Sequence, residues 1–237
     1  MMDHDFCNLR AVDKHKVLLV LNNSECVGRE MLLEFWRACP TRVCADGAAN
    51  WLFEENLQPD ILCGDLDSVD SNVLEYFRNQ TCEICLDPDQ DTTDMEKCLG
   101  RISNLTLGRD SLHVYVLGAF GGRFDHEMAN INAAFAFTPK FARLVLLSKG
   151  NVGEVLLGNF QHRLHFPVLG LTCGLLPVLG PCMVRETQGL KYNLAMQQLQ
   201  FGGLISSSNQ TINLCVHVQC VDSPVLFTFV EHPVNIN

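Results

Sequence analysis

Short apolar runs and helical patterns alternate along the first 150 residues of the chain. The run Val17-Leu18-Leu19-Val20-Leu21 is apolar at every position, which is typical of a strand buried on both faces. Runs of this kind predict strands at residues 16–21, 42–45, 60–63, 82–86, 113–117 and 143–147. Helical periodicity lies between them, at residues 29–37, 49–55, 71–79, 92–102 and 126–137. This alternation predicts a parallel sheet with helices on both faces.

From about residue 152 the helical periodicity disappears, and strand-length runs follow one another between glycines. They predict strands at residues 154–157, 163–166, 171–176, 182–186, 198–201, 211–218 and 225–230. This rhythm is typical of a small antiparallel sandwich. We therefore expect an α/β fold: a parallel-sheet α/β/α domain at residues 1–150, followed by an antiparallel β-sandwich at residues 151–237. The boundary is expected within residues 149–158.

The charge balance argues against one class of partner. Among 237 residues, 27 are acidic and 17 basic, which gives a net charge of −10. A nucleic-acid binder normally carries a basic face, so we expect no nucleic-acid partner.

The apolar runs are far shorter than the roughly 20 residues of a membrane span. No secretory signal is evident, and the 12 cysteines do not reach disulfide-scaffold density. We expect a cytoplasmic protein with reduced thiols and no membrane contact.

Acidic residues follow the predicted strands at their carboxyl ends, where open parallel sheets bind ligands. Asp46 follows the strand at 42–45, while Asp65 and Asp67 follow the strand at 60–63. Because Asp65 and Asp67 are two residues apart, an extended chain points both carboxylates the same way. Such crowding favours a bound cation, and oxygen ligands suit Mg²⁺. The alternative is that Asp67 caps the next helix and Asp65 faces water.

Two further loops reach the same predicted edge. Asp91 and Asp94 are three apart at a predicted helix start, hence on one face of its first turn, although Asp91 could equally be the N-cap. Gly121-Gly122 and Arg123 offer backbone amides and a guanidinium to an anion, or else form a tight turn with a surface arginine. Asp125 is either the N-cap of that helix or a ligand contact. Together, these loops predict Mg-dependent phosphoryl or pyrophosphoryl transfer.

Seven segments, in this order and spacing, resemble the thiamine pyrophosphokinase family over most of the chain. They are ADGAAN at 45–50, GDLDS at 64–68, PDQDTTD at 88–94, GGRFD at 121–125, HRLH at 162–165, GLKYNL at 189–194 and SSSN at 206–209. The resemblance implies a nucleotide-binding α/β domain followed by a thiamine-binding sandwich. It also implies a homodimer with the active site at the subunit interface. The implied reaction converts thiamine and ATP, with Mg²⁺, into thiamine diphosphate and AMP.

The resemblance also assigns roles to single residues. Those implied to hold Mg²⁺ are Asp65, Asp67 and Asp94, which are catalytic together with Arg123. Those implied to bind or shape the nucleotide and phosphate side are Asp46, Asn50, Gln90, Asp91, Gly122, Arg123 and Asp125. Those implied to hold thiamine, from the partner subunit, are Tyr192, Ser206, Ser208 and Asn209. Tyr192 stands where many relatives carry Trp, and Ala48 replaces a common glycine, so this chain departs from the family pattern at both positions.

Two other interpretations remain open from the residues. The segment Asp65-Leu66-Asp67-Ser68-Val69 resembles the nucleophile motif of haloacid-dehalogenase phosphatases, in which Asp65 would be phosphorylated. That motif usually follows the first strand of its domain, whereas two predicted strands precede it here. The other alternative is a non-catalytic nucleotide or thiamine sensor. Retention of all the acidic residues argues against a sensor, which would not need the full cluster.

Overall fold

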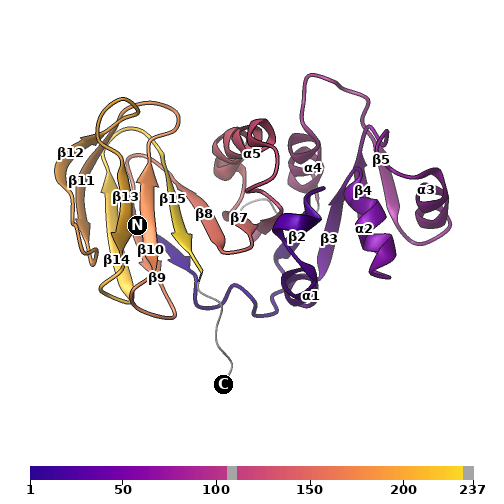
Figure 1. Cartoon of the computed structure of the whole chain (residues 1–237), viewed down its shortest axis with the longest axis horizontal. Helices are drawn as coiled ribbons and strands as arrows, with labels where there is room; N and C mark the ends of the chain where they lie inside the picture. Colours follow the sequence, from indigo (N-terminus) through magenta and orange to yellow (C-terminus); the bar gives the residue numbers. More distant parts are fainter. Residues whose placement is uncertain (106–110, 232–237) are drawn as a thin grey trace. The chain divides into compact units, whose positions relative to one another are not determined.

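The computed structural model describes residues 1–105 and 111–231 and divides into two compact units (Figure 1). One unit is Arg10–Lys149; the other combines Met1–Leu9 with Gly150–Asn237, whose residues 232–237 lie outside the described part. The first nine residues thus differ from the predicted division, which placed them in the α/β domain. The reason is strand β1 (Met2–Asp5), which pairs in parallel with β9 (Gln161–His165). Its sequence, MDHD, carries no apolar signal that would predict a strand.

The unit Arg10–Lys149 is built on a parallel sheet. Its strands are β2 (Lys16–Val20), β3 (Thr41–Ala45), β4 (Ile61–Gly64), β5 (Glu83–Leu86), β6 (His113–Leu117) and β7 (Arg143–Ser148). They lie in the order β5-β4-β3-β2-β6-β7, and each neighbouring pair is parallel. The four residues Val17–Val20 are completely buried, as expected of a central strand covered on both faces. The predicted parallel sheet is confirmed.

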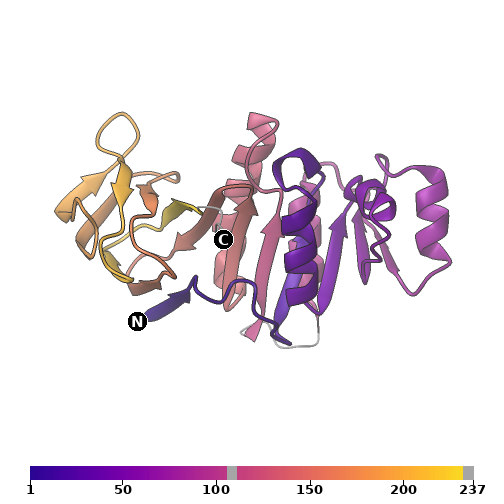
Figure 2. The same cartoon turned by 60° about the horizontal axis from the view of Figure 1, so that its bottom comes forward.

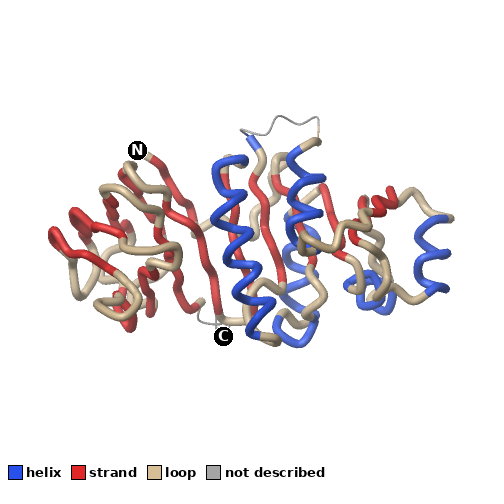
Figure 3. Tube along the Cα trace, turned by 90° about the horizontal axis from the view of Figure 1, so that it is seen from above, coloured by secondary structure: helices blue, strands red, loops and turns tan. Residues whose placement is uncertain are grey.

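Helices cover both faces of this sheet. They are α1 (Arg29–Ala38), α2 (Ala48–Glu54), α3 (Ser71–Arg78), α4 (Asp94–Ser103) and α5 (Phe124–Phe137), with short 3-10 turns at Ser24–Cys26 and Thr138–Lys140. Because α1–α3 connect strands in one direction and α4–α5 in the other, right-handed crossovers place the two groups on opposite faces. Figure 2 looks onto the face that α1 covers, and Figure 3 onto the face of α4 and α5. No helix in the described ranges is long and apolar enough to cross a membrane.

The strand order reverses between β2 and β6. From β2 the chain proceeds through β3 and β4 to β5, and then returns to β6 on the other side of β2. At such a switch point the loops leave in opposite directions and open a crevice beyond the carboxyl ends of the strands. The fold therefore places the residues after β2, β3, β4 and β6 around one crevice.

The second unit packs two sheets face to face. One has the order β1-β9-β14-β11-β12 and the other β13-β10-β15-β8. The remaining strands are β8 (Asn151–Leu156), β10 (Thr172–Leu176), β11 (Cys182–Gln188), β12 (Ala195–Leu199), β13 (Ser206–Gln210), β14 (Cys215–Cys220) and β15 (Val225–Val230). Apart from β1 with β9, the strand pairs are antiparallel, which confirms the predicted sandwich. Phe6, Phe166 and Phe229 meet between the sheets, with ring centroids 4.9–5.3 Å apart.

A buried polar chain fastens β1 inside this unit. His4 Nδ1 lies 2.7 Å from Glu154 Oε1, and His4 Nε2 lies 2.9 Å from His162 Nδ1. His162 Nε2 lies 2.9 Å from the carbonyl oxygen of Leu157, which can only accept. His162 must therefore carry its proton on Nε2 and accept from His4 on Nδ1. One proton then remains between His4 and Glu154, and the three buried side chains satisfy one another.

His162 makes stability depend on pH. Burial lowers the pKa of this imidazole to about 4, against roughly 6.5 in an unfolded chain. A group whose pKa is depressed on folding contributes fully above its unfolded pKa, and the contribution is lost as the pH falls through 6.5 towards 4. We expect this group to lower the free energy of unfolding in urea by about 2 kcal/mol between pH 7 and pH 4.5.

Two variants separate this effect from general acid sensitivity. His162→Gln cannot titrate and is expected to lose less stability than wild type over the same pH range. His217→Gln removes an exposed histidine from the neighbouring strand β14 and is expected to keep the wild-type slope. If the free energy of unfolding of His162→Gln falls with pH as steeply as that of wild type, the pH dependence does not come from His162.

Candidate active site

Three carboxylates converge at the carboxyl edge of the parallel sheet. Asp46 follows β3, while Asp65 and Asp67 follow β4. One carboxylate oxygen from each residue lies within 4.8 Å of the other two. Asp46 is 4% exposed, and its Oδ1 has no hydrogen-bond partner within the described part of the chain. A buried carboxylate oxygen without a donor is costly unless a cation satisfies it. The donor set, oxygen only, suits Mg²⁺.

The backbone around Asp46 brings these carboxylates together. The Asp46 amide donates to the Cys63 carbonyl at 3.0 Å, which joins the ends of β3 and β4. Asp46 and Leu66 both have positive φ, 41° and 64°, a conformation that aspartate tolerates better than most residues. A Cβ on Gly64 would lie 2.9 Å from the Cβ of Asp46, so the closeness of the two loops requires glycine there.

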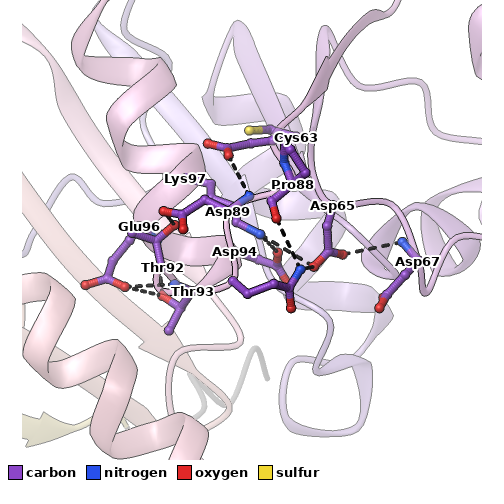
Figure 4. A network of polar contacts seen from close by, with 12 residues as sticks. Cys63, Asp65, Asp67, Pro88, Asp89, Thr92, Thr93, Asp94, Glu96 and Lys97 are labelled. Atoms are coloured by element: carbon purple, nitrogen blue, oxygen red, sulfur yellow. Dashed lines mark hydrogen bonds and ion pairs between the residues drawn. The ribbon is translucent and has the colours of Figure 1, made fainter.

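Asp65 lies at the centre of a polar network (Figure 4). Gln90 Nε2 donates to Asp65 Oδ2 at 3.0 Å, and the Asp67 amide lies 3.4 Å from Asp65 Oδ1. Lys97 Nζ lies 3.5 Å from the same Oδ2. The hydrogen bond from Gln90 is the largest cause that lowers the pKa of Asp65 below its ordinary value. The hydrogen bond from the Asp67 amide and the charge of Lys97 lower this pKa further. Asp65 is therefore an anion with a defined orientation.

Asp94 has the opposite electrostatic character. Burial, and then the neighbouring Asp46 carboxylate, raise the pKa of Asp94, although Lys97 Nζ, 3.7 Å from Asp94 Oδ1, works against the rise. For Lys97 itself, burial lowers the pKa, but the carboxylates of Asp65 and Asp94 outweigh it, so the pKa lies above its usual value. The ammonium thus stays charged between two acids, one from the loop after β4 and one from α4.

Helix α4 begins at Asp94, two residues later than predicted. Thr93 is its N-cap: Thr93 Oγ1 accepts from the Glu96 amide at 3.3 Å, and Glu96 Oε2 accepts from the Thr93 amide at 2.8 Å. Asp91 is therefore neither the N-cap nor on the first turn with Asp94, and both predictions for it were wrong. Its amide donates to Asp89 Oδ1 at 3.0 Å within the preceding loop. The reciprocal Thr93–Glu96 capping box outcompetes a lone aspartate cap.

Asn50 fastens the acidic loop from behind. Its Nδ2 donates to the Ser68 carbonyl and its Oδ1 accepts from the Asp70 amide, both at 3.0 Å. Asn50 does not line the cavity, so it contributes to the site through the conformation of the loop that carries Asp67.

The loop after β6 forms the opposite side. Gly118, Gly121 and Gly122 have positive φ, between 73° and 87°. Asn23 Nδ2 lies 3.1–3.2 Å from the carbonyl oxygens of Gly118, Phe120 and Gly121, so one side chain gathers the loop. The Gly121 amide, predicted to face an anion, instead donates to Glu127 Oε2 at 2.8 Å, so that prediction was wrong.

Arg123 and Asp125 form a two-pronged ion pair at the start of α5. Arg123 Nε lies 3.1 Å from Asp125 Oδ1, and Arg123 Nη2 lies 2.5 Å from Asp125 Oδ2. The hydrogen bonds from Arg123 lower the pKa of Asp125 to about 2. Both side chains are largely exposed, so the pair orients Arg123 more than it stabilises the fold. Arg123 is the N-cap residue, and Asp125 is not.

A cavity of about 550 Å³ joins these parts within the unit Arg10–Lys149. Four predicted site residues line it: Asp46, Asp65, Asp94 and Arg123. The residues predicted for the metal and nucleotide side that do not line it are Asn50, Asp67, Gln90, Asp91, Gly122 and Asp125. The volume is typical of small-molecule sites.

The four residues predicted to hold thiamine lie together in the sandwich. Asn209 is buried in β13; its Nδ2 donates to the Tyr192 carbonyl at 2.8 Å, and its Oδ1 accepts from the Tyr192 amide at 3.1 Å. Ser206 Oγ lies 3.5 Å from the same Nδ2. Tyr192 is 60% exposed, and Ser208 is exposed with φ 55°. The segment Ser206–Gln210, for which no strand was predicted, is strand β13, because its backbone pairs with β10 whatever its polarity.

Several residues of this site were not predicted from the sequence, among them Asn23, Lys97 and Glu127. Asn23 follows β2 and could have been found by the rule that drew attention to Asp46. Lys97 lies three residues after Asp94, on the same helix face, which marks it as a neighbour of the acid. Glu127 gave no signal apart from its place in the first turn of a helix.

Comparison with known proteins gives consistent matches. A family model described as "Thiamin pyrophosphokinase, catalytic domain" matches residues 32–146, and "Thiamin pyrophosphokinase, vitamin B1 binding domain" matches residues 161–226. Thiamine pyrophosphokinase 1 of Oryza sativa is 37% identical over 213 residues, covering 81% of this chain and 80% of that protein. Thiamine pyrophosphokinase 2 of Arabidopsis thaliana is 34% identical over 213 residues, covering 81% of this chain and 79% of that protein.

Solved structures share the fold. Yeast thiamin pyrophosphokinase superimposes with a TM-score of 0.83 at 23% identity, covering 97% of this chain and 91% of that one. The Candida albicans protein has a TM-score of 0.82 at 24% identity, covering 97% of this chain and 94% of that one.

The glycine loop yields a paired stability prediction. A Cβ at Gly121, where φ is 81°, would lie 2.8 Å from Cys26 Sγ. We expect Gly121→Ala to lower the free energy of unfolding in urea by about 1–3 kcal/mol, from backbone strain and overpacking. Gly100→Ala is the matched control: an added Cβ there, inside α4, would have no described atom from outside the helix backbone within 4 Å, and the change should raise stability by about 1 kcal/mol. Equal effects at the two positions would contradict the account of the loop.

Proposed function

The chain belongs to the thiamin pyrophosphokinase family, and we propose that it makes thiamine diphosphate and AMP from thiamine and ATP. The thiamine hydroxyl oxygen attacks the β-phosphorus of ATP and forms the new O–P bond. The bond from that phosphorus to the oxygen retained by AMP breaks, and the hydroxyl proton is released. The observation that carries the proposal is the oxygen cluster with the buried Asp46 Oδ1, which has no hydrogen-bond partner among the described residues, within a chain that both family models match.

We propose that the acidic cluster holds Mg²⁺, which when bound would neutralise charge on the polyphosphate. The residues supporting this are Asp46, Asp65 and Asp67, because their oxygens are close enough to share one ion. Asp94 stays a predicted ligand. It borders the same cavity, but its carboxylate forms an ion pair with Lys97. Positioning of the substrates and neutralisation of their charge can supply most of the rate in phosphoryl transfer.

The nucleotide side is proposed to lie along the loops around the cavity. Arg123, oriented by Asp125, would contact phosphate oxygens, to which a guanidinium can donate two parallel hydrogen bonds. Gln90 would act by orienting Asp65, and Asn50 by holding the loop from Ser68 to Asp70. Asp91 and Gly122, which shape the two loops, stay predicted phosphate-side residues.

The thiamine side is proposed to be the cluster around Tyr192. An exposed aromatic ring suits a cationic thiazolium, and hydroxyls such as those of Ser206 and Ser208 suit an aminopyrimidine. The buried Asn209, which holds the Tyr192 backbone through two hydrogen bonds, supports a fixed presentation of the ring.

We also propose a homodimer, in which this cluster completes the active site of the partner subunit. The support is the family resemblance together with exposed apolar side chains near Tyr192 in the sequence of the sandwich: Met196, Phe201 and Leu204. Sedimentation of the purified protein tests the proposal; a monomer at the concentrations used for activity would contradict it. A cytoplasmic location stays a prediction from the cysteine content.

The reaction is tested by resolving the products of thiamine, ATP and Mg²⁺ by chromatography. We expect thiamine diphosphate and AMP, with turnover reduced at least about a hundredfold in Asp67→Asn, because the cluster would lose one of its charges. Glu75→Gln removes an exposed acid from α3 and should keep wild-type turnover.

Other products would identify other chemistry. ADP with thiamine monophosphate would place the attack at the γ-phosphorus. Phosphate release without any need for thiamine would favour the phosphatase alternative. Thiamine binding without turnover would favour the sensor.

Tyr192 should affect the use of thiamine and not of ATP. We expect Tyr192→Ala to raise the KM for thiamine about tenfold, because the cation loses an aromatic face, while Tyr192→Phe keeps it within about threefold. The KM for ATP should stay unchanged in both. Phe160→Ala removes an exposed aromatic of the sandwich that is not among the apolar side chains near Tyr192, and it serves as the control. A similar loss in Phe160→Ala would indicate a general effect on the sandwich.

A further inference from the structure

Lys97 is a buried cation inside the acidic cluster. It lies on α4, one turn after Asp94, and only 7% of its surface is exposed. Lysine is seldom buried unless its ammonium is paired. Here the ammonium lies 3.5 Å from Asp65 Oδ2 and 3.7 Å from Asp94 Oδ1, so it links the loop after β4 to the start of α4.

Lys97 also determines which side of Asp65 remains available. Asp65 Oδ2 faces both Lys97 and the amide of Gln90, while Oδ1 lies on the side of the Asp67 amide. The contacts to Oδ2 prevent the carboxylate from turning freely. Asp65 is thereby held in the position in which it meets Asp46 and Asp67.

The charges explain why such a residue is needed. Asp46, Asp65, Asp67 and Asp94 gather at one sheet edge, and like charges at this spacing repel strongly where water is partly excluded. One ammonium among them offsets part of that repulsion permanently. A divalent cation entering the cluster must then bind beside a charge of its own sign.

We propose that Lys97 is a positioning residue that acts as a built-in counterion: it holds Asp65 and Asp94 in place before the divalent cation binds and weakens the binding of that cation. The inference rests on the cation site of the proposed function, but its test does not depend on turnover. Because Lys97 weakens the binding of the divalent cation, the cation can exchange. Because Lys97 holds Asp65 and Asp94 in place, the site stays ordered when no cation is bound.

The test measures Mg²⁺ binding to metal-free protein by calorimetry, together with thermal unfolding with and without Mg²⁺. Lys97→Met keeps an unbranched stem and removes the charge. We expect a lower unfolding midpoint without metal, a larger rise in the midpoint on adding Mg²⁺, and a Kd for Mg²⁺ about tenfold lower than wild type. Turnover should nevertheless fall at least tenfold at saturating Mg²⁺, with the KM for thiamine within about twofold.

Two further variants act as controls. Lys97→Arg keeps the charge and should bind Mg²⁺ within about threefold of wild type, with turnover partly retained. Lys14→Met removes an exposed lysine of the same unit and should change nothing. A purely structural role for Lys97 would instead weaken Mg²⁺ binding in the methionine variant.

Unchanged or weaker Mg²⁺ binding in Lys97→Met would overturn the inference, as would a more than tenfold change in Lys97→Arg. If Lys97→Met is unfolded without metal, recovery of its fold by Mg²⁺ supports the counterion role, and failure to recover at saturating Mg²⁺ overturns it. Absence of Mg²⁺ binding in wild type would overturn it together with the proposed site. The expected binding changes without thiamine turnover would uphold the inference and reject the proposed function.

Discussion

Repulsion between carboxylates is the constraint on which the rest of the candidate site depends. Parallel strands deliver the residues that follow them to a single edge, so Asp46, Asp65 and Asp67 cannot avoid one another. The surrounding structure answers this with donors and positive charge. Gln90 and Lys97 reach Asp65, and α4 starts where its first turn brings Asp94 against the same lysine. A buried lysine is the expected consequence of acids brought together before any metal is bound.

The other side of the crevice is organised largely by hydrogen bonds around the glycine loop. After β6 the chain turns through glycines with positive φ, and the Asn23 amide collects the carbonyl oxygens that this turn exposes. Carbonyl oxygens facing inwards would repel a phosphate. Asn23 binds these oxygens and lines the cavity together with Arg123 and side chains of α5. The cavity therefore has one side suited to a cation and another suited to an anion.

In the sandwich, too, hydrogen bonds of buried side chains hold the surrounding chain in place. Asn209 uses both ends of its amide to hold the backbone of Tyr192, which frees the ring to stay exposed. In the interior, His4, Glu154 and His162 satisfy one another in a line that ends on a backbone carbonyl. Buried polar groups of this kind stabilise one arrangement of the chain above others, because a displaced member leaves an unpaired partner behind. This is why a strand as polar as β1 can belong to the unit.

The sequence by itself determined the parallel sheet, the sandwich and the acidic edge, because apolar runs and the residues that end them are local signals. It also identified Asp46, Asp65, Asp94 and Arg123, which line the cavity. Only the tertiary structure decided that Lys97 lies among the acids, that the Gly121 amide is taken by Glu127, and that Asp91 stays outside α4. It also decided that β1 and β13 are strands. These outcomes depend on which of several possible partners each group takes once the chain is folded, or on competition between neighbouring caps, and the pattern of a single segment does not decide between them.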